Sequence, residues 1–438
     1  MIFLQPRTSV PVYVTLLVPL ISVLATLIAG GLIFAVLGYA PLPALYEFFI
    51  APLSRPDQFG NLLVKACPLI IIGTGLVFCY RANIWNIGAE GQLIAGAVGA
   101  GGLALSFPDS TSVFLLPCMA VCAVLSGALW AAIPALCKVR FRTNEILVSL
   151  MLTYVAALLI DWIVRGPWRD PMSFGFPLTP YYPDAGLITA LNLPFIGRLG
   201  QLHWGVPVAL LIAVAGYFFL SRMLGGFQVK LMGDAPRAGT FAGFSPNRVT
   251  VGVLLTSGGL AGLAGMIEVS ANIGQLQPNI SFGYGFTAII VAFLARLNPL
   301  AVIIAGLVVA LAELGGDTAQ ISMAIPKVVT GIFKGILLFF LLAGETLRPC
   351  TLSLPQPVRQ AASPLNSRST HRFHGCYSRQ QVCPLRLRGL GHHEHLLGSL
   401  RISLRLEPLS RVSGGLVVGD FLRAHQCSGP LPALPHHF

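Results

Sequence analysis

Residues 61–105 read NLLVKACPLIIIGTGLVFCYRANIWNIGAEGQLIAGAVGAGGLAL, and this stretch decides the class of fold. It contains two apolar runs, 61–80 and 84–105, and a helix of roughly 20 apolar residues is long enough to cross the hydrocarbon core of a bilayer. The second run opens with a polar interruption, Asn83-Ile-Trp-Asn-Ile-Gly-Ala-Glu-Gly-Gln92, which holds two Asn, one Glu, one Gln and two Gly. The stretch therefore predicts two membrane spans with a polar break at the start of the second.

Apolar runs of similar length recur through the first 347 residues, and a shorter one lies near 284–296. The other runs lie near 12–38, 113–137, 144–164, 206–221, 249–271, 299–316 and 325–344. We therefore expect an all-α polytopic membrane protein with about ten transmembrane segments, counted at roughly 20 residues each and including discontinuous helices.

The composition also predicts a membrane-embedded chain. Hydrophobic residues make up 55% of the 438 residues, charged residues make up only 10%, and the mean hydropathy is +0.77. A soluble domain carries roughly 25% charged residues, because its surface must be wetted. With less than half of that share, most of this surface must face lipid.

The net charge of +12 does not indicate a nucleic-acid partner, because the excess is unevenly placed. Residues 1–347 hold 17 Lys and Arg against 13 Asp and Glu, whereas residues 348–438 hold 11 Arg, no Lys and three acids. Basic residues in short loops mark the cytoplasmic side of a membrane protein. The connection 138–142 and the loop 222–248 are both basic, so we expect both in the cytoplasm. Both ends of the 1–347 body are then cytoplasmic, and the loop 165–205 lies outside.

Two membrane segments are interrupted by glycine and polar groups, one in each half of the body. The first is Asn83–Gln92, and the second is Gly283-Tyr-Gly-Phe-Thr-Ala288 at the start of the short span. Paired glycine-interrupted spans point to a midplane site built from discontinuous helices, because unwound backbone at that depth must be buried in protein or line a watery path. Close helix packing through small residues is the alternative for the glycines. It explains Glu90 less well, because a carboxylate in hydrocarbon is costly and usually functional.

Four further charges within the apolar runs are candidate intramembrane charges. Asp161 lies near the end of a span, beside a tryptophan and close to an arginine, so we expect it to be an interfacial anchor. Glu268 and Glu313 lie toward the outer ends of their spans and could reach water. Lys334 lies deeper and should face the bundle and find a partner, for which Glu268 and Glu313 are both candidates.

Several motifs, in order, resemble one family of permease subunits of bacterial ABC importers. They are Asn86-Ile-Gly-Ala-Glu-Gly-Gln92, Ser257-Gly-Gly-Leu-Ala-Gly-Leu-Ala-Gly-Met-Ile-Glu268, Gly283-Tyr-Gly-Phe-Thr-Ala-Ile-Ile-Val-Ala292 and Leu297-Asn-Pro299. The resemblance runs from about residue 10 to 347. It is to the group that carries ribose-type sugars, branched-chain amino acids and nucleosides, and it is closest to the nucleoside (simple-sugar) branch.

The resemblance also implies a role for the 222–248 loop. Gly233-Asp-Ala-Pro-Arg-Ala-Gly-Thr-Phe-Ala-Gly243 looks like the cytoplasmic coupling helix of importer permeases. Read from its residues, Asp234 is a plausible N-cap, proline suits the first turn and Gly243 suits the stop. Arg237 and Phe241 are four residues apart and so would share one helical face. An ordinary amphipathic loop is the alternative.

The body carries no residues that would make it an enzyme. It has no Gly-x-x-x-x-Gly-Lys-Ser/Thr loop to cradle phosphates, no nucleophile motif and no paired histidines, since His203 is the only histidine of 1–347. We therefore expect no catalytic residue, no cofactor and no metal site. ATP hydrolysis would come from a separate subunit.

The preferred function is translocation of a small polar solute, a nucleoside or sugar, across the bacterial inner membrane. The candidate pathway residues are Asn83, Trp85, Asn86, Glu90, Gln92, Tyr284 and Phe286. The resemblance implies cytoplasmic ATP-binding subunits, a second permease subunit (a homodimer or a heterodimer) and an extracytoplasmic solute-binding protein. An ion- or proton-coupled secondary transporter, with Glu90 or Lys334 titrating, is the rival.

Residues 348–438 differ from the body, with eight of the nine histidines and no run long enough to span. The His and Cys spacing fits no zinc pattern, and a basic tail that touches anionic lipid is a second explanation. A disordered segment or the product of a shifted reading frame explains best the Arg, Pro, Ser, Gly, Leu and His bias. The resemblance to permeases also ends where this segment begins.

Overall fold

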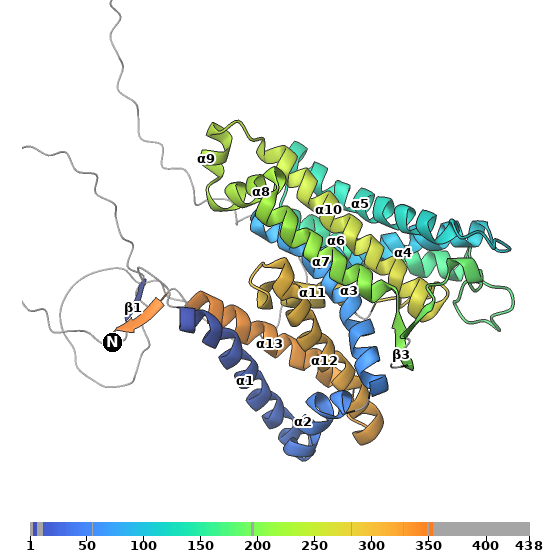
Figure 1. Ribbon diagram of the computed structural model, residues 1–438, viewed down its shortest axis with the longest axis horizontal. Coiled ribbons are helices and arrows are strands. Elements are labelled where there is room, and N and C mark those ends of the chain that lie inside the picture. Colours follow the sequence, from blue (N-terminus) through green and yellow to red (C-terminus); the bar gives the residue numbers. More distant parts are fainter. Residues whose placement is uncertain are drawn as a thin grey trace, which may run out of the picture. The chain divides into compact units, whose positions relative to one another are not determined.

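The computed structural model describes residues 3–6, 12–54, 56–193, 197–281, 283–326, 328–347 and 350–353, and these residues are predominantly helical (Figure 1). Each expected apolar run coincides with a helix. These helices are α1 (Val12–Val36), α3 (Pro56–Arg81), α4 (Ala89–Ser106), α5 (Leu115–Phe141), α6 (Glu145–Arg165), α7 (Gly205–Arg222), α10 (Pro246–Ile267), α11 (Tyr284–Leu294), α12 (Pro299–Met323) and α13 (Val328–Leu347). The shorter helices are α2 (Pro41–Phe49), η1 (Ala51–Leu53), η2 (Asp184–Gly186), α8 (Leu224–Asp234), α9 (Pro236–Phe241) and the π-helical turn η3 (Glu268–Ile273).

Six helices in the described part of the chain are long and apolar enough to cross a membrane. They cover Gln58–Arg81, Leu115–Phe141, Glu145–Arg165, Gly205–Arg222, Pro246–Ile273 and Pro299–Met323. Leu20–Val36 of α1 and Tyr284–Leu294 are shorter apolar helices. The expectation of a helical membrane protein with several spans is therefore confirmed, with six candidate spans among the described residues; the total of about ten stays a prediction.

Helix α3 is the interior helix of the described bundle. Its apolar window is 89% buried, whereas the windows of α5 and α6 are 22% and 28% buried. It packs against α7, α10, α11 and α12. The poorly buried helices expose leucine, valine and aromatic side chains along their length, as a lipid-facing surface requires.

Glycine contacts hold α4, α5 and α10 together. A Cβ built on Gly96 of α4 would lie 2.1 Å from the Cα of Gly262 in α10, and a Cβ on Gly262 would lie 2.2 Å from the carbonyl oxygen of Ala123 in α5. No larger residue fits at either position without moving a backbone. Lipid tails are as apolar as the helices, so van der Waals contact at such close approach supplies the association that burial supplies in water.

A second apolar cluster joins α1, α2, α12 and α13, which pack against one another. Its centre is aromatic. The rings of Phe34 and Phe333 each lie near that of Phe48, with centroids 5.4 Å apart in both pairs. Such contacts add about 0.5–1.5 kcal/mol beyond the area that they bury.

Two small antiparallel strand pairs differ from the all-α expectation. In the loop 165–205, β2 (Ala190–Leu193) pairs with β3 (Gly197–His203), and at the ends of the body β1 (Phe3–Pro6) pairs with β4 (Cys350–Ser353). Of the segment 348–438, only the four residues of β4 lie within the described residues.

The loop 165–205, which the sequence analysis places outside, is joined to the segment after η3 by backbone hydrogen bonds. The amide of Thr179 donates to the carbonyl of Leu276 at 3.1 Å, and that of Tyr182 donates to the carbonyl of Gly274 at 2.9 Å. Next to α7, burial lowers the pKa of His203 to about 4, so its neutral Nδ1 accepts a hydrogen bond from the amide of Gly205 at 3.0 Å. Segments 165–205 and 272–281 thus form one packed cap.

We expect Gly262→Ala to destabilise the protein by about 1–3 kcal/mol, because the added methyl group meets the backbone of α5 and forces the helices apart. Gly252→Ala in the same helix is the matched control, since a Cβ there has no atom within 4 Å. The midpoint of thermal unfolding in one detergent compares the two. Equal midpoints for both variants would contradict the close packing of α5 and α10.

Candidate functional site

The first polar break is an unwound connection inside the bundle. Helix α3 ends at Arg81 and α4 begins at Ala89, and Asn83 between them has a left-handed φ of 56°. The side chain of Asn86 donates to Oγ of Ser257 at 3.0 Å. Ser257 lies near the middle of the 28-residue Pro246–Ile273 span, so the side chain of Asn86 reaches the middle part of this apolar helix, whereas Trp85 lies beside Glu145 at the start of α6.

The side chains of Asn86 and Gln92 hydrogen-bond to each other across the first break. Nδ2 of Asn86 donates to Oε1 of Gln92 at 2.9 Å, and Nε2 of Gln92 donates back to Oδ1 of Asn86 at 3.1 Å. The same Oδ1 accepts the amide of Gly88 at 3.1 Å. Asn86 is 0% exposed and Gln92 is 1% exposed. These two amides therefore satisfy one another and the backbone of the break, and they do not face an open space.

The second polar break meets the first. Helix α11 begins at Tyr284, after Gly283 with a φ of 87°. Oε2 of Glu90 accepts the amide of Gly285 at 2.6 Å, and a Cβ on Gly285 would lie 2.2 Å from the backbone nitrogen of Glu90. A carboxylate at a helix N-terminus satisfies an amide that the helix leaves open and interacts favourably with the helix dipole. Glu90 thus joins two discontinuous helices that are 195 residues apart in the chain.

The seven predicted pathway residues divide into two groups. Asn86, Glu90, Gln92 and Tyr284 are buried, whereas Asn83, Trp85 and Phe286 are exposed, with 40% of Trp85 and 37% of Phe286 accessible. The structure brings both groups to the same two breaks, at the starts of α4 and α11. Which of the seven residues contact a solute remains a prediction.

Trp85 belongs to an aromatic cluster at the first break. Its ring centroid lies 5.4 Å from that of Tyr80 and 5.8 Å from that of Phe293, and the rings of Tyr80 and Phe293 stack at 5.1 Å. The Tyr80 hydroxyl donates to the carbonyl of Asn86 at 3.3 Å. The cluster connects α3, the break and α11.

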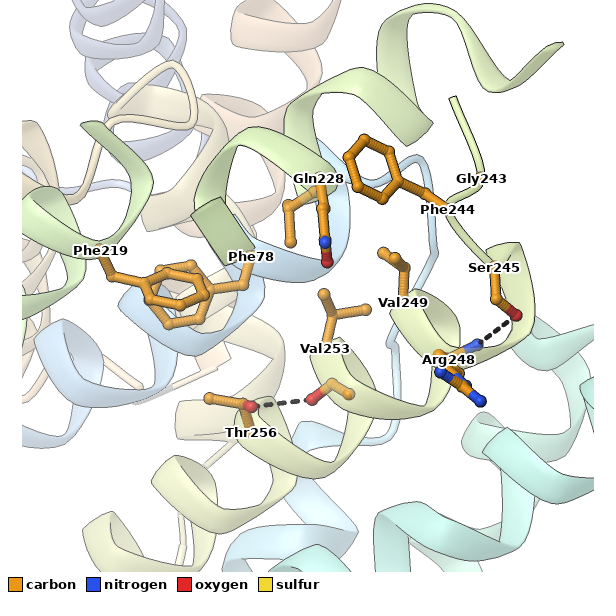
Figure 2. Close-up of a pocket in the computed structure, with 13 residues that line it drawn as sticks. Phe78, Phe219, Gln228, Gly243, Phe244, Ser245, Arg248, Val249, Val253 and Thr256 are labelled. Carbon is orange, nitrogen blue, oxygen red and sulfur yellow. Dashed lines mark hydrogen bonds between the residues drawn. The ribbon is translucent and has the colours of Figure 1, made fainter. Parts of the chain in front are cut away.

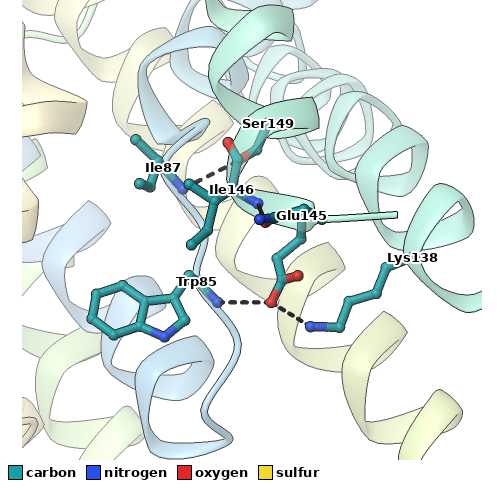
Figure 3. Close-up of polar contacts among 7 residues, drawn as sticks. Trp85, Ile87, Lys138, Glu145, Ile146 and Ser149 are labelled. Atoms are coloured by element: carbon teal, nitrogen blue, oxygen red, sulfur yellow. Dashed lines mark hydrogen bonds and ion pairs between the residues drawn. The ribbon is translucent and has the colours of Figure 1, made fainter. Parts of the chain in front are cut away.

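Helix α6 holds the break from the other side (Figure 3). The amide of Ile87 donates to Oγ of Ser149 at 3.3 Å, and the amide of Trp85 lies 3.5 Å from Oε1 of Glu145. The same carboxylate oxygen pairs with Nζ of Lys138 on α5. Within this cluster, the extended backbone of the break is anchored by side chains of the first turns of α6.

The predicted intramembrane charges have mixed outcomes. Asp161 pairs with Arg165 at 2.8 Å on an exposed helix end, as expected for an anchor. Glu268 is buried rather than in water, and Oε2 accepts from Nδ2 of Asn272 at 2.9 Å across the π-helical turn η3. Glu313 is buried in α12. The Lys334 side chain lies outside the described residues, so its partner stays a prediction.

One ion pair between α3 and α12 was not predicted from the sequence. Nζ of Lys65 in α3 lies 2.7 Å from Oδ2 of Asp317 in α12, and both side chains are about one-quarter exposed, at 26% and 30%. A signal was present in the sequence, because Lys65 is a lone cation in an apolar run and Asp317 follows Glu313 by four residues on the same helical face. The pair joins the interior helix α3 to α12.

The loop 222–248 forms two helices, α8 and α9, with Pro236 at the first position of α9 and Gly243 just past its end at a φ of 83°. The expected N-cap was wrong: Asp234 is the last residue of α8, and Ala235 precedes α9 without a side-chain cap. Helix α8 extends through Asp234, the residue that the sequence analysis assigned to the N-cap of the next helix. Arg237 is exposed and Phe241 is 92% exposed, so both are free for contact.

Within the described residues, no three or more His, Cys, Asp or Glu side chains lie together in a group that could hold a metal ion. The chemistry of this site is therefore that of amides, carboxylates and aromatic rings around two helix breaks.

Comparison with known proteins identifies similar chains. Residues 58–342 match the family described as the permease component of branched-chain amino acid transport systems. The glucose ABC transporter permease protein TsgB13 of Haloferax volcanii is 33% identical over 347 residues, which cover 78% of this chain and 91% of that protein. The guanosine ABC transporter permease protein NupP of Bacillus subtilis is 29% identical over 340 residues, with coverages of 76% and 94%. The nucleoside ABC transporter permease protein NupB of Lactococcus lactis is 24% identical over 336 residues, with coverages of 74% and 90%.

We expect Asn86→Leu to lower the free energy of unfolding by about 1–3 kcal/mol, because it leaves the buried amide of Gln92 without its partner. The double variant Asn86→Leu/Gln92→Leu should lose less than the sum of the two single losses. Thermal unfolding in detergent measures the cycle, with Asn247→Leu, an exposed amide at the start of α10, as the control. Additive losses would show that the two amides do not act as a pair.

For the unpredicted ion pair, Lys65→Asp and Asp317→Lys should each lower the unfolding midpoint, and the swapped double variant should recover part of the loss. Each single variant places two like charges together, whereas the swap restores attraction. Polar contacts within membranes couple by about 0.5–1.5 kcal/mol. A swapped variant that is no more stable than either single variant would rule out a direct pair.

Proposed function

This chain belongs to the family of permease components of branched-chain amino acid transport systems, and from that premise we propose that it carries a nucleoside or a sugar through the membrane. As a permease component it is the translocation subunit of an ABC importer and not the ATPase. The observation that carries the proposal is the contact between Glu90 and Gly285, which unites two helix breaks inside the bundle. Midplane sites of transporters are built from such discontinuous helices.

The proposed solute class follows from the relatives and from the chemistry of the site. The relatives are named for glucose, guanosine and nucleosides, all of which carry neighbouring hydroxyl groups. At the two breaks, Asn83 offers an exposed amide, and Trp85 and Phe286 offer exposed aromatic surface. An amide can hydrogen-bond a hydroxyl group or a base edge, and an aromatic face can stack on a nucleobase or on a sugar ring.

We propose a topology of ten membrane segments. The six long apolar helices are joined by α1, α4, α11 and α13, each of which coincides with an apolar run of the sequence. The basic 138–142 connection and the 222–248 loop lie in the cytoplasm under this topology. The ends of the body are then cytoplasmic, and the packed cap of 165–205 and 272–281 lies outside, where a solute-binding protein would dock.

The α8–α9 loop is proposed as the contact to the ATP-binding subunits. Arg237 and Phe241 are both exposed on α9 and lie four residues apart, so they share one face of the helix. This face offers a cation and an aromatic ring to a groove of the partner subunit. A second permease subunit, identical or related, would complete the assembly. Residues 348–438 are assigned no part in transport, which agrees with a family match that ends at residue 342.

The test is uptake into proteoliposomes that contain the permease with its ATP-binding subunits and solute-binding protein. Labelled guanosine and labelled glucose are compared, and uptake of one of them should require ATP hydrolysis. Phe241→Ala should reduce uptake at least tenfold without lowering the unfolding midpoint, because loss of a central aromatic contact costs about 2 kcal/mol or more.

Phe141→Ala is the matched control, since Phe141 is an exposed phenylalanine at the same proposed membrane face, outside the α8–α9 loop. Its uptake should match that of the unaltered protein. Uphill uptake by the permease alone, under a proton gradient and without nucleotide, would overturn the proposal in favour of a secondary transporter.

A further inference from the structure

A groove of about 380 Å³ lies between α8 and α10, beside the proposed coupling loop (Figure 2). Phe78 of α3 and Phe219 of α7 form one end of it, and their rings meet edge to face with centroids 5.4 Å apart. None of the seven predicted pathway residues lines this groove. It is therefore a separate feature from the two helix breaks.

The groove runs from the start of α10 toward the middle of the membrane. Ser245 and Phe244 line it before α10 begins, and Thr256 lines it ten residues after Pro246. At 1.5 Å per residue, this length of helix is about 15 Å, which is half of the hydrocarbon core. The groove thus spans the depth of one leaflet, the cytoplasmic one in the proposed topology.

The lining of the groove is both apolar and polar. Phe78, Phe219 and Val253 line the groove with apolar surface, whereas Gln228 and Arg248 supply polar groups to it. Figure 2 shows the Gln228 side chain pointing toward Val253. Among the described residues, the Arg248 guanidinium has no ion-pair partner and the Gln228 side chain makes no hydrogen bond.

We propose that this groove binds one anionic phospholipid of the cytoplasmic leaflet. Its phosphate lies at Arg248 and Gln228, and one acyl chain lies along Phe78, Phe219 and Val253. The inference rests on the proposed topology. Charge complementarity supports it, because basic pockets between membrane helices on the cytoplasmic side are suited to anionic headgroups. A soluble anion would leave the apolar walls unfilled, and an ATP-binding subunit docks at the surface and does not reach the depth of Val253.

The position of the groove gives such a lipid a consequence for coupling. Gln228 belongs to α8, and Phe244 follows the end of α9, so the bound lipid contacts the loop on both of its sides. The opposite wall is α10, which carries Ser257 at the helix break. A lipid in this place would pack between the coupling loop and the core, where it would stabilise one position of the loop.

The test uses native mass spectrometry of the purified full chain, titrated in detergent with phosphatidylglycerol or phosphatidylcholine. The unaltered protein should retain one phosphatidylglycerol more strongly than phosphatidylcholine. Arg248→Gln should weaken that retention about fivefold, since one basic residue near a membrane surface contributes about that factor. Arg222→Gln, an exposed arginine at the end of α7 that does not line the groove, is the matched control and should retain the lipid.

A second pair of variants tests the acyl chain. Gly252 lines the groove, and a Cβ there meets no atom within 4 Å, so Gly252→Leu places a large apolar side chain in the groove and Gly252→Ala leaves most of the space open. Both changes also favour the helix. Gly252→Leu should abolish retention, and Gly252→Ala should preserve it.

Equal retention of the two lipids, or unchanged retention in both Arg248→Gln and Gly252→Leu, would overturn the proposal. If Gly252→Leu instead prevents assembly with a second copy or with the ATP-binding subunits and leaves lipid retention unchanged, the groove is a protein contact and the proposal is wrong. The assay contains no solute and no nucleotide, so the outcome of the uptake experiment is independent of it.

Discussion

The hydrogen bonds of one unwound segment constrain the rest of the bundle. Hydrocarbon supplies no partner for a free amide or carbonyl, so the unwound residues between α3 and α4 can lie inside the bundle only if protein groups satisfy them. The Asn86–Gln92 pair, Ser149 and Glu145 supply those partners from α4 and α6, and Ser257 supplies one from α10. Helices α4, α6 and α10 must therefore keep their positions and their rotations about their own axes for the polar groups of the break to stay satisfied.

Small residues and polar groups have complementary roles in this arrangement. Gly96 and Gly262 let α4 and α10 approach until their backbones touch, and Gly285 does the same for α11 against α4. That approach brings Glu90 within 2.6 Å of an amide of the second break. Without the glycines the carboxylate could not reach the helix N-terminus, and without the carboxylate the N-terminus of α11 would lie inside the bundle with that amide unsatisfied. Close packing through glycine and a polar helix break are thus both present, and each depends on the other; that the break has a function in transport stays a prediction.

Sequence reasoning recovered what depends on composition and local chemistry, and it missed what depends on partners. Apolar runs located the helices, and glycine with polar residues located both breaks. Which amide satisfies Asn86 depends on Gln92 lying one helical turn beyond the break and on the rotation of α10, and neither is readable from spacing. Lys65 looked like an isolated cation because its partner, Asp317, is about 250 residues away on α12. The hairpin of β2 and β3 was missed since 190–203 has no regular alternation. Asp234 was assigned to the wrong helix end because α8 extends through it, and only Ala235 separates α8 from α9.

The contacts of Arg81 show how the loop 222–248 can act on the breaks. A Cβ on Gly233 of α8 would lie 1.9 Å from the carbonyl oxygen of Arg81, so α8 packs directly on the last residue of α3 before the first break. From the same residue, Nε donates to the carbonyl of Leu297 at 3.0 Å, just beyond the C-terminal end of α11. A cation at a helix C-terminus is favoured by the helix dipole, so this contact also stabilises α11. A displacement of α8 toward α3 would therefore press directly on Arg81. Through Arg81, this movement would reach the unwound segment that carries Asn86. It would also reach α11, whose N-terminal amide of Gly285 hydrogen-bonds Glu90.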